Sequence, residues 1–163
     1  MSEEIRVSVT VNGRAYERLV EPRRSLADFL RHDLLLHGTH VGCEMGACGA
    51  CTVLFDGQAI KSCLMLAVQA QGHEIITVES LAGRGPLHAL QRAFRDCHAL
   101  QCGFCTPGFL MVALALERSH RKVDQEALKE ELAGNICRCT GYRGIVNAVS
   151  RFLEESDERS ADA

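Results

Sequence analysis

Three cysteines in one glycine-rich stretch are the residues of this chain best suited to chemistry. Cys43, Cys48 and Cys51 are separated by four and then by two residues. This C-x4-C-x2-C spacing is that of plant-type [2Fe-2S] sites, which take a fourth thiolate from further along the chain. Cys63 is available for that role. We therefore predict that these four cysteines hold a [2Fe-2S] cluster.

The glycines between these cysteines support the same prediction. Gly42, Gly46 and Gly49 are interleaved with the thiols. A cluster bound by four thiolates carries net negative charge, so its loop must turn tightly and aim backbone N–H groups at the sulfurs. Glycine permits positive φ and a close approach of the backbone. The alternative is a glycine-rich surface loop with incidental cysteines, and the spacing argues against it.

A second set of cysteines lies in the other half of the chain. Cys102 and Cys105 form a C-x2-C pair, and Cys137 and Cys139 form a C-x-C pair. Both pairs fall at expected helix ends, where a positive helix N-terminus favours a thiolate. A structural zinc site is the alternative, because C-x2-C is a normal half of such a site, whereas C-x-C is less usual there. The iron–sulfur loop in the first half favours a second cluster here.

Composition and charge limit the remaining classes. The chain has 163 residues, nine cysteines and a formal net charge of -3, which argues against nucleic-acid binding. The N-terminus lacks a basic start followed by an apolar run, and the most apolar stretch, Phe109–Leu116, is too short to span a membrane. We therefore expect a cytoplasmic protein, in which many cysteines indicate metal binding or redox work.

The pattern of the first half predicts a small mixed sheet crossed by one helix. Apolar residues alternate over 5–11, Asn12-Gly13 is a strong hairpin turn signal, and 14–20 is the expected returning strand. Ser25 is the expected N-cap of the short helix. Further strands are expected over three ranges, 52–55, 59–62 and 73–78.

The second half has helical periodicity. The composition changes at 81–86, and helices are expected over 87–97, from Pro107 onward, from the N-cap Asp124 onward and over 142–155. Residues 156–163 are expected to be a disordered tail. Leu87, Leu90, Phe94 and Cys97 lie on one apolar face, so Cys97 is predicted to be a buried core thiol.

Two longer motifs make a family resemblance specific. Residues 101–108 (QCGFCTPG) and 135–142 (NICRCTGY) resemble the small iron–sulfur subunit of the xanthine oxidase family of molybdenum hydroxylases. The first cysteine loop resembles the first cluster site of that family. The resemblance covers roughly residues 4 to 155. Within the family, the carbon monoxide dehydrogenase small subunit and relatives that hydroxylate N-heterocycles look nearest.

The resemblance implies an α+β fold. It implies a plant-type ferredoxin-like (β-grasp) domain over residues 1–82, followed by a four-helix-bundle [2Fe-2S] domain over 83–163. Gln101 matches a position that hydrogen-bonds the pterin in this family. The implied ligands are Cys43, Cys48, Cys51 and Cys63 for the plant-type cluster and Cys102, Cys105, Cys137 and Cys139 for the other.

The resemblance also implies the function and the partners. Single electrons would pass from molybdenum through the helical-domain cluster and the ferredoxin-like-domain cluster to FAD. A large subunit would carry molybdopterin cytosine dinucleotide and a medium subunit would carry FAD, with a dimer of heterotrimers as the assembly. No nucleophile with a base is visible, so no turnover is expected from this chain alone. Solvated surface is the expectation for most of the histidines; His40 lies near the first loop, and tuning of a cluster is its alternative role.

Two other functions remain open from the sequence. A free ferredoxin that shuttles electrons explains one cluster but not the helical half. A non-catalytic interaction module with zinc in the C-terminal half explains both cysteine sets, and it predicts zinc in place of iron and acid-labile sulfide there.

Overall fold

Alternating valines build the first strand of the sheet. The computed structural model describes residues 4–82 and 85–161, with side chains up to residue 159. β1 (Ile5–Val11) pairs antiparallel with β2 (Arg14–Val20), and the inward-facing valines of β1 are buried. Asn12 and Gly13 both have positive φ, 52° and 74°, which is the backbone that a tight two-residue hairpin turn requires. The predicted first hairpin is confirmed.

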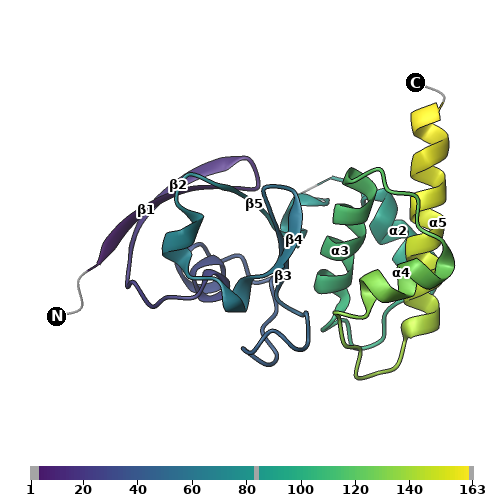
Figure 1. Cartoon of the computed structure of the whole chain (residues 1–163), viewed down its shortest axis with the longest axis horizontal. Coiled ribbons are helices and arrows are strands. Elements are labelled where there is room, and N and C mark those ends of the chain that lie inside the picture. The colour runs from purple at the N-terminus through teal and green to yellow at the C-terminus, as the bar shows by residue number, and fades with distance from the viewer. Residues whose placement is uncertain (1–3, 83–84, 162–163) are drawn as a thin grey trace.

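The remaining strands complete a five-stranded mixed sheet in the order β2-β1-β5-β3-β4 (Figure 1). β3 (Thr52–Phe55) pairs antiparallel with β4 (Gln58–Lys61), and β5 (Glu74–Ile76) runs parallel to β1 and antiparallel to β3. β5 is shorter than the predicted strand over 73–78, because the chain turns into a single 3-10 turn at Val78–Ser80.

The predicted crossing helix is present, but its second turn is wider than an α-helix. Ser25 Oγ accepts a hydrogen bond from the N–H of Asp28 at 3.0 Å and so caps α1 (Leu26–Asp28). A π-helical turn, η1 (Phe29–Asp33), follows directly. Short 3-10 turns also occur at η2 (Ser62–Leu64) and η3 (Ala67–Ala70). The apolar face of this segment packs under the sheet through three buried side chains, Leu26, Phe29 and Leu30.

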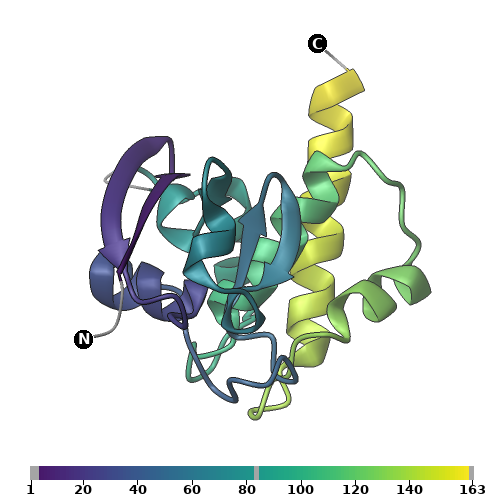
Figure 2. The same cartoon turned by 60° about the vertical axis from the view of Figure 1, so that its left-hand side comes forward.

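Helices make up the second half. They are α2 (Ala89–Asp96), α3 (Thr106–Arg118), α4 (Gln125–Leu132) and α5 (Tyr142–Ala161). α3 is the helix nearest the sheet in both views (Figures 1 and 2). It is apolar on nearly all sides because it lies between the sheet and the other helices. The combination of a mixed sheet with separate helices confirms the α+β class.

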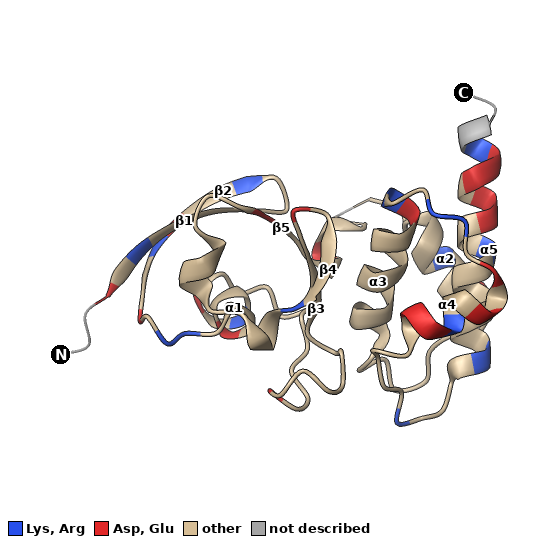
Figure 3. Cartoon of the chain, in the orientation of Figure 1, with Lys and Arg blue, Asp and Glu red and all other residues tan. Residues whose placement is uncertain are grey.

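The prediction of a disordered tail over 156–163 is wrong for the residues that the structure describes, because α5 continues as a helix to Ala161. Ser156 Oγ donates a hydrogen bond to Glu117 Oε1 at 2.9 Å, which ties the extended part of α5 to α3. Acidic and basic residues are frequent in this part of α5 (Figure 3). Residues 162–163 of the predicted tail lie outside the described residues.

α2 starts later than predicted. His88 is its N-cap, with Nδ1 accepting a hydrogen bond from the N–H of Leu90 at 3.3 Å. Leu87 therefore precedes the helix and is 42% exposed instead of buried. Cys97 is the C-cap residue and packs half-buried at the edge of the helical core, so its predicted core role is correct only in part.

Two clusters of buried side chains form the interior. One lies between the sheet and α1, and the other lies among the helices. Leu54 of β3 belongs to the helical cluster, which joins the two halves through a shared apolar contact. In the part of the chain that the structure describes, no helix is long and apolar enough to cross a membrane.

Candidate metal centres

The first cysteine loop lies below β3, at the end of the molecule where the loops between the helices also lie (Figure 1). Cys51 is buried, whereas Cys43, Cys48 and Cys63 are half-buried. Gly46 and Gly49 have positive φ of 75° and 71°, as the predicted tight turns require. A Cβ atom on Gly46 would lie 2.4 Å from a methyl carbon of Leu64, so a larger residue would displace this side chain as well as strain the turn.

The four thiols of this loop associate as two pairs. Cys43 is hydrogen-bonded to Cys48, and Cys63 is hydrogen-bonded to Cys51. Backbone N–H groups of Met45 and Cys48 lower the pKa of Cys43 to about 7. Burial raises the pKa of Cys63 to about 11. Cys43 is therefore prepared as a thiolate, whereas Cys63 needs a nearby positive charge, which a bound iron ion would supply.

The second set of cysteines shows the same arrangement. Cys102 is hydrogen-bonded to Cys139, and Cys105 is hydrogen-bonded to Cys137. The backbone N–H of Phe104 is the largest cause of a lowered pKa at Cys102. Burial raises the pKa of Cys105 to about 12. The structure therefore brings together all four cysteines predicted for this site.

The pairing of thiols fits a cluster with two metal ions better than a single ion. A [2Fe-2S] cluster needs two thiolates on each of two irons. A single tetrahedral zinc ion would instead draw all four thiols together. The arrangement of both cysteine sets therefore fits the [2Fe-2S] group.

Backbone donors around the sulfurs also fit an anionic cluster. The N–H of Cys48 points at Cys43 Sγ and that of Gly141 points at Cys137 Sγ, each at 3.4 Å. Thr106 follows Cys105 directly, and its buried Oγ1 has no hydrogen-bond partner among the described residues. Such donors favour added negative charge on bound sulfur.

The two cysteine sites meet at a seam, in which the backbone carbonyls of Cys48 and Gly49 accept hydrogen bonds from Ile136 and Asn135. The N–H of Ile136 donates to the carbonyl oxygen of Cys48 at 2.9 Å, and the side-chain amide of Asn135 donates to that of Gly49 at 3.2 Å. A Cβ atom on Gly108 would lie 2.4 Å from the Gly49 carbonyl oxygen, so glycine is required for this close approach. Ile136 directly precedes Cys137. One hydrogen bond therefore links a ligand candidate of the first site, Cys48, to the residue before a ligand candidate of the second.

Sequence reasoning missed the seam and the contact of His40. Asn135 and Gly49 are 86 residues apart, and His40 bonds to Phe104 across 64 residues. The buried side chain of Asn135 leaves only a weak signal in the sequence, namely an asparagine two residues before Cys137. The partners of Asn135 and His40 are set only by how the two halves pack.

Gln101 lies at the surface beside the second site. Its Nε2 donates a hydrogen bond to the carbonyl oxygen of Cys139 at 3.2 Å, and its side chain is exposed. This contact places the side chain next to a ligand candidate and within reach of a group bound from outside. The contact with a pterin stays a prediction.

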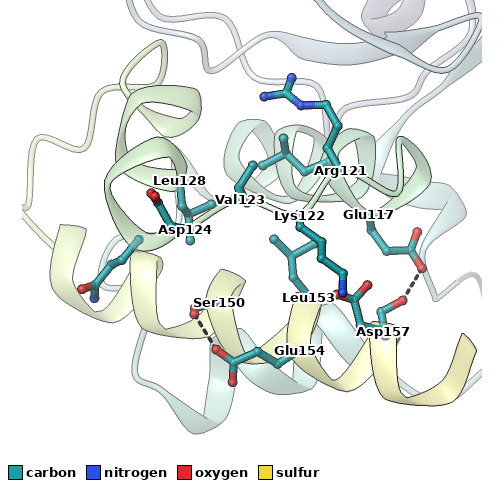
Figure 4. A pocket seen from close by; sticks show the side chains of 13 residues that line it. Glu117, Arg121, Lys122, Val123, Asp124, Leu128, Ser150, Leu153, Glu154 and Asp157 are labelled. Carbon is teal, nitrogen blue, oxygen red and sulfur yellow. Dashed lines mark hydrogen bonds between the residues drawn. The ribbon is translucent and has the colours of Figure 1, made fainter. Parts of the chain in front are cut away.

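A pocket between α3, α4 and α5 lies away from the cysteines (Figure 4). Glu117, near the end of α3, lines it and accepts a hydrogen bond from Ser156 at 2.9 Å. Cys105 precedes the other end of the same helix, roughly 18 Å away at 1.5 Å per residue. Charges of both signs line the pocket, including Lys122 and Asp157, so the pocket has no evident part in redox chemistry.

Comparisons with known proteins agree with this chemistry. A "[2Fe-2S] binding domain" model matches residues 77–150, and a "2Fe-2S iron-sulfur cluster binding domain" model matches residues 9–82. Caffeine dehydrogenase subunit gamma of Pseudomonas sp. (strain CBB1) is 58% identical over 88% of this chain and 87% of the relative. The xanthine dehydrogenase iron-sulfur-binding subunit of Escherichia coli O157:H7 is 45% identical over 91% of this chain and 94% of the relative. The chain belongs to the xanthine oxidase family, as a small iron–sulfur subunit.

A solved structure extends this relationship to the fold of the small iron–sulfur subunit. A chain of quinoline 2-oxidoreductase from Pseudomonas putida 86 superimposes with a TM-score of 0.90 at 46% identity, covering 96% of this subunit and 98% of that chain. The subunit is the iron–sulfur component of a molybdenum-dependent oxidoreductase. The family model for residues 77–150 also argues against the zinc interaction module.

Proposed function

We propose that this subunit relays single electrons from a molybdenum cofactor on one partner subunit to FAD on another. The observation that supports the relay best is the joining of two four-cysteine sites by the hydrogen bond from Ile136 N–H to the Cys48 carbonyl oxygen, 2.9 Å long. When bound, each [2Fe-2S] cluster supplies one-electron redox chemistry. The chain would supply its ligands, backbone donors and a short link between the two sites.

The proposal divides the chain into two domains with one cluster each. Residues 1–82 would form the ferredoxin-like, β-grasp domain, with Cys43, Cys48, Cys51 and Cys63 as ligands. Residues 83–163 would form the four-helix-bundle domain, with Cys102, Cys105, Cys137 and Cys139 as ligands. The separate buried clusters of the two halves support this division, whose boundary adjoins residues 83–84, outside the described part of the chain.

The direction of flow rests on the exposed edge of the second site. Cys102 and Gln101 are both exposed, so this site can be approached closely from a partner subunit. We place the molybdenum subunit, with molybdopterin cytosine dinucleotide, at this edge, and the FAD subunit near the first site. Gln101 would hydrogen-bond the pterin. The dimer of heterotrimers and the cytoplasmic location stay predictions.

The substrate of the complete enzyme would be an N-heterocycle. The names of two relatives, caffeine dehydrogenase and quinoline 2-oxidoreductase, refer to compounds of this class. Substrate chemistry would belong to the molybdenum subunit, because the cysteine sites and their backbone donors in this subunit provide electron transfer.

The test is metal analysis and EPR of the complex isolated from its native cell. We expect about four irons and four acid-labile sulfides per copy of this subunit, because each cluster contains two of each. The reduced complex should show two distinct [2Fe-2S] signals, and substrate should reduce both clusters and FAD. A chain that purifies without a molybdenum subunit would instead support the free ferredoxin. Zinc in place of half the iron would support the interaction module.

A further inference from the structure

A contact between two rings also joins the two cysteine sites. His40 precedes the first site by three residues, and Phe104 lies between Cys102 and Cys105 in the second. The two rings stack with centroids 4.9 Å apart and an interplanar angle of 20°. His40 Nδ1 also lies 2.8 Å from the carbonyl oxygen of Phe104.

This hydrogen bond requires a proton on one particular nitrogen of the His40 imidazole. A carbonyl oxygen only accepts hydrogen bonds, so His40 Nδ1 must carry the proton and donate it. The ring is thus oriented by a stacking contact and by a directional bond to the same residue. Gly42 leaves room for this packing, because a Cβ atom there would lie 3.3 Å from the Phe104 ring and 3.2 Å from Cys48 Sγ.

Both the backbone N–H and the backbone carbonyl of Phe104 are hydrogen-bonded. Its carbonyl oxygen accepts from His40, and its N–H donates to the sulfur of Cys102, whose pKa is lowered by that bond. The preceding residue, Gly103, has a positive φ of 81°, so the loop itself is tightly turned. The orientation of the donor to Cys102 therefore depends on a contact made by the other half of the chain.

We propose that His40 is a positioning residue for the second site and that it sets the redox potential there by holding the Phe104 N–H on Cys102 Sγ. This inference rests on the proposed function, since it assumes a cluster at Cys102, Cys105, Cys137 and Cys139. An N–H donor to a ligand sulfur favours the more negative, reduced form. Loosening Phe104 therefore makes reduction of this cluster harder.

Two variants separate the hydrogen bond from the ring contact. His40→Phe keeps an aromatic ring for stacking but has no donor, whereas His40→Asn keeps an N–H donor on a short side chain without the ring. His37→Phe is the matched control, because His37 lies in the same loop with an exposed side chain. Each is measured in the purified complex by EPR-monitored redox titration, with iron and sulfide analysis. The Cys48→Ser complex, which should retain only the second cluster, assigns the signals.

We expect His40→Phe to shift the second cluster to more negative potential. A weakened bond to a charged sulfur corresponds to roughly a tenfold lower ratio of reduced to oxidised cluster at a fixed potential. His40→Asn should restore most of the shift, and His37→Phe should cause none. An altered signal of the second cluster in His40→Phe alone would give further support.

Three results would overturn the inference. They are unchanged potentials of the second cluster in both His40 variants, equal shifts in both variants, and loss of that cluster from both. The last would make His40 a structural residue. These results are distinct from failure of the proposed function, which would appear as missing iron and sulfide in the unmutated complex.

Discussion

The side-chain amide of Asn135 donates a hydrogen bond to the carbonyl oxygen of Gly49 at 3.2 Å, and Asn135 is only 3% exposed. This bond crosses from the loop before Cys137 to the loop between Cys48 and Cys51. It therefore fixes the distance between the two cysteine sites, on which the rate of electron transfer between them depends.

Asn135→Ala should destabilise the junction between the two halves. The substitution removes one of three donors to the Gly49 carbonyl oxygen, which also accepts from the N–H and Oγ1 of Thr52, so it costs about 0.5–1.5 kcal/mol, the contribution of one hydrogen bond. We expect a lower midpoint of urea denaturation, followed by loss of cluster absorbance. Asn147→Ala, at an exposed position of α5, is the control and should have almost no effect. Equal midpoints for the two variants would contradict the prediction.

Gly49→Ala should be more damaging than its backbone strain alone predicts. A Cβ atom there would lie 2.5 Å from the Gly134 carbonyl oxygen, and φ is +71°. Gly57→Ala is the matched control, because Gly57 has φ +84° but no atom within 4 Å of the added carbon. The positive φ costs each variant about 1–2 kcal/mol. The urea midpoint should fall clearly further for Gly49→Ala, and similar midpoints would show that the close contact relaxes freely.

Cys48→Ser should remove the first cluster and leave the second, because the thiol pairs of the two sites are separate. Iron and sulfide should fall by about half, since each cluster holds two irons. Substrate should still reduce molybdenum, but electrons should not reach flavin. Cys97→Ser is the control: this thiol is half-buried at the end of α2 and should leave both clusters in place. Loss of both clusters from Cys48→Ser would count against independent sites.

Alkylation of the cluster-free chain should distinguish Cys43 from Cys63. The pKa of Cys43 is lowered to about 7 by backbone N–H groups, and burial raises that of Cys63 to about 11. Because only the thiolate reacts, iodoacetamide at about pH 8 should label Cys43 well before Cys63. The Cys43 rate should rise as pH increases through 7. Peptide mass spectrometry measures both rates, and equal labelling would refute the assignment.

His88 should make stability depend on pH. Burial is the main cause that lowers its pKa from 6.5 in the folded chain, so the unfolded chain binds the proton more readily. Stability from this group is therefore full above about pH 6.5 and is lost as the pH falls below it. His88→Asn keeps an N-cap acceptor that does not titrate. The thermal midpoint should then fall less between pH 7.5 and 5.5, whereas His37→Asn should leave the slope unchanged.

The sequence alone determined the candidate ligands. The spacing of cysteines, the glycines between them and the turn at Asn12-Gly13 are local features, and each acts through neighbouring backbone geometry. Periodicity located the strands and helices for the same reason. Its errors lay at ends of elements: α5 continues beyond the predicted stop, where Ser156 donates a hydrogen bond to Glu117 of α3.

Only the tertiary structure decided how the two sites face each other. The sequence contains no sign that Gly49 would meet Gly108 and Asn135, or that His40 would stack on Phe104, because these contacts join residues that are far apart in the chain. Long-range contacts depend on how the sheet packs against α3. Pairing of thiols likewise needed the folded loops, since spacing places four sulfurs near one another but does not say which two are hydrogen-bonded as a pair.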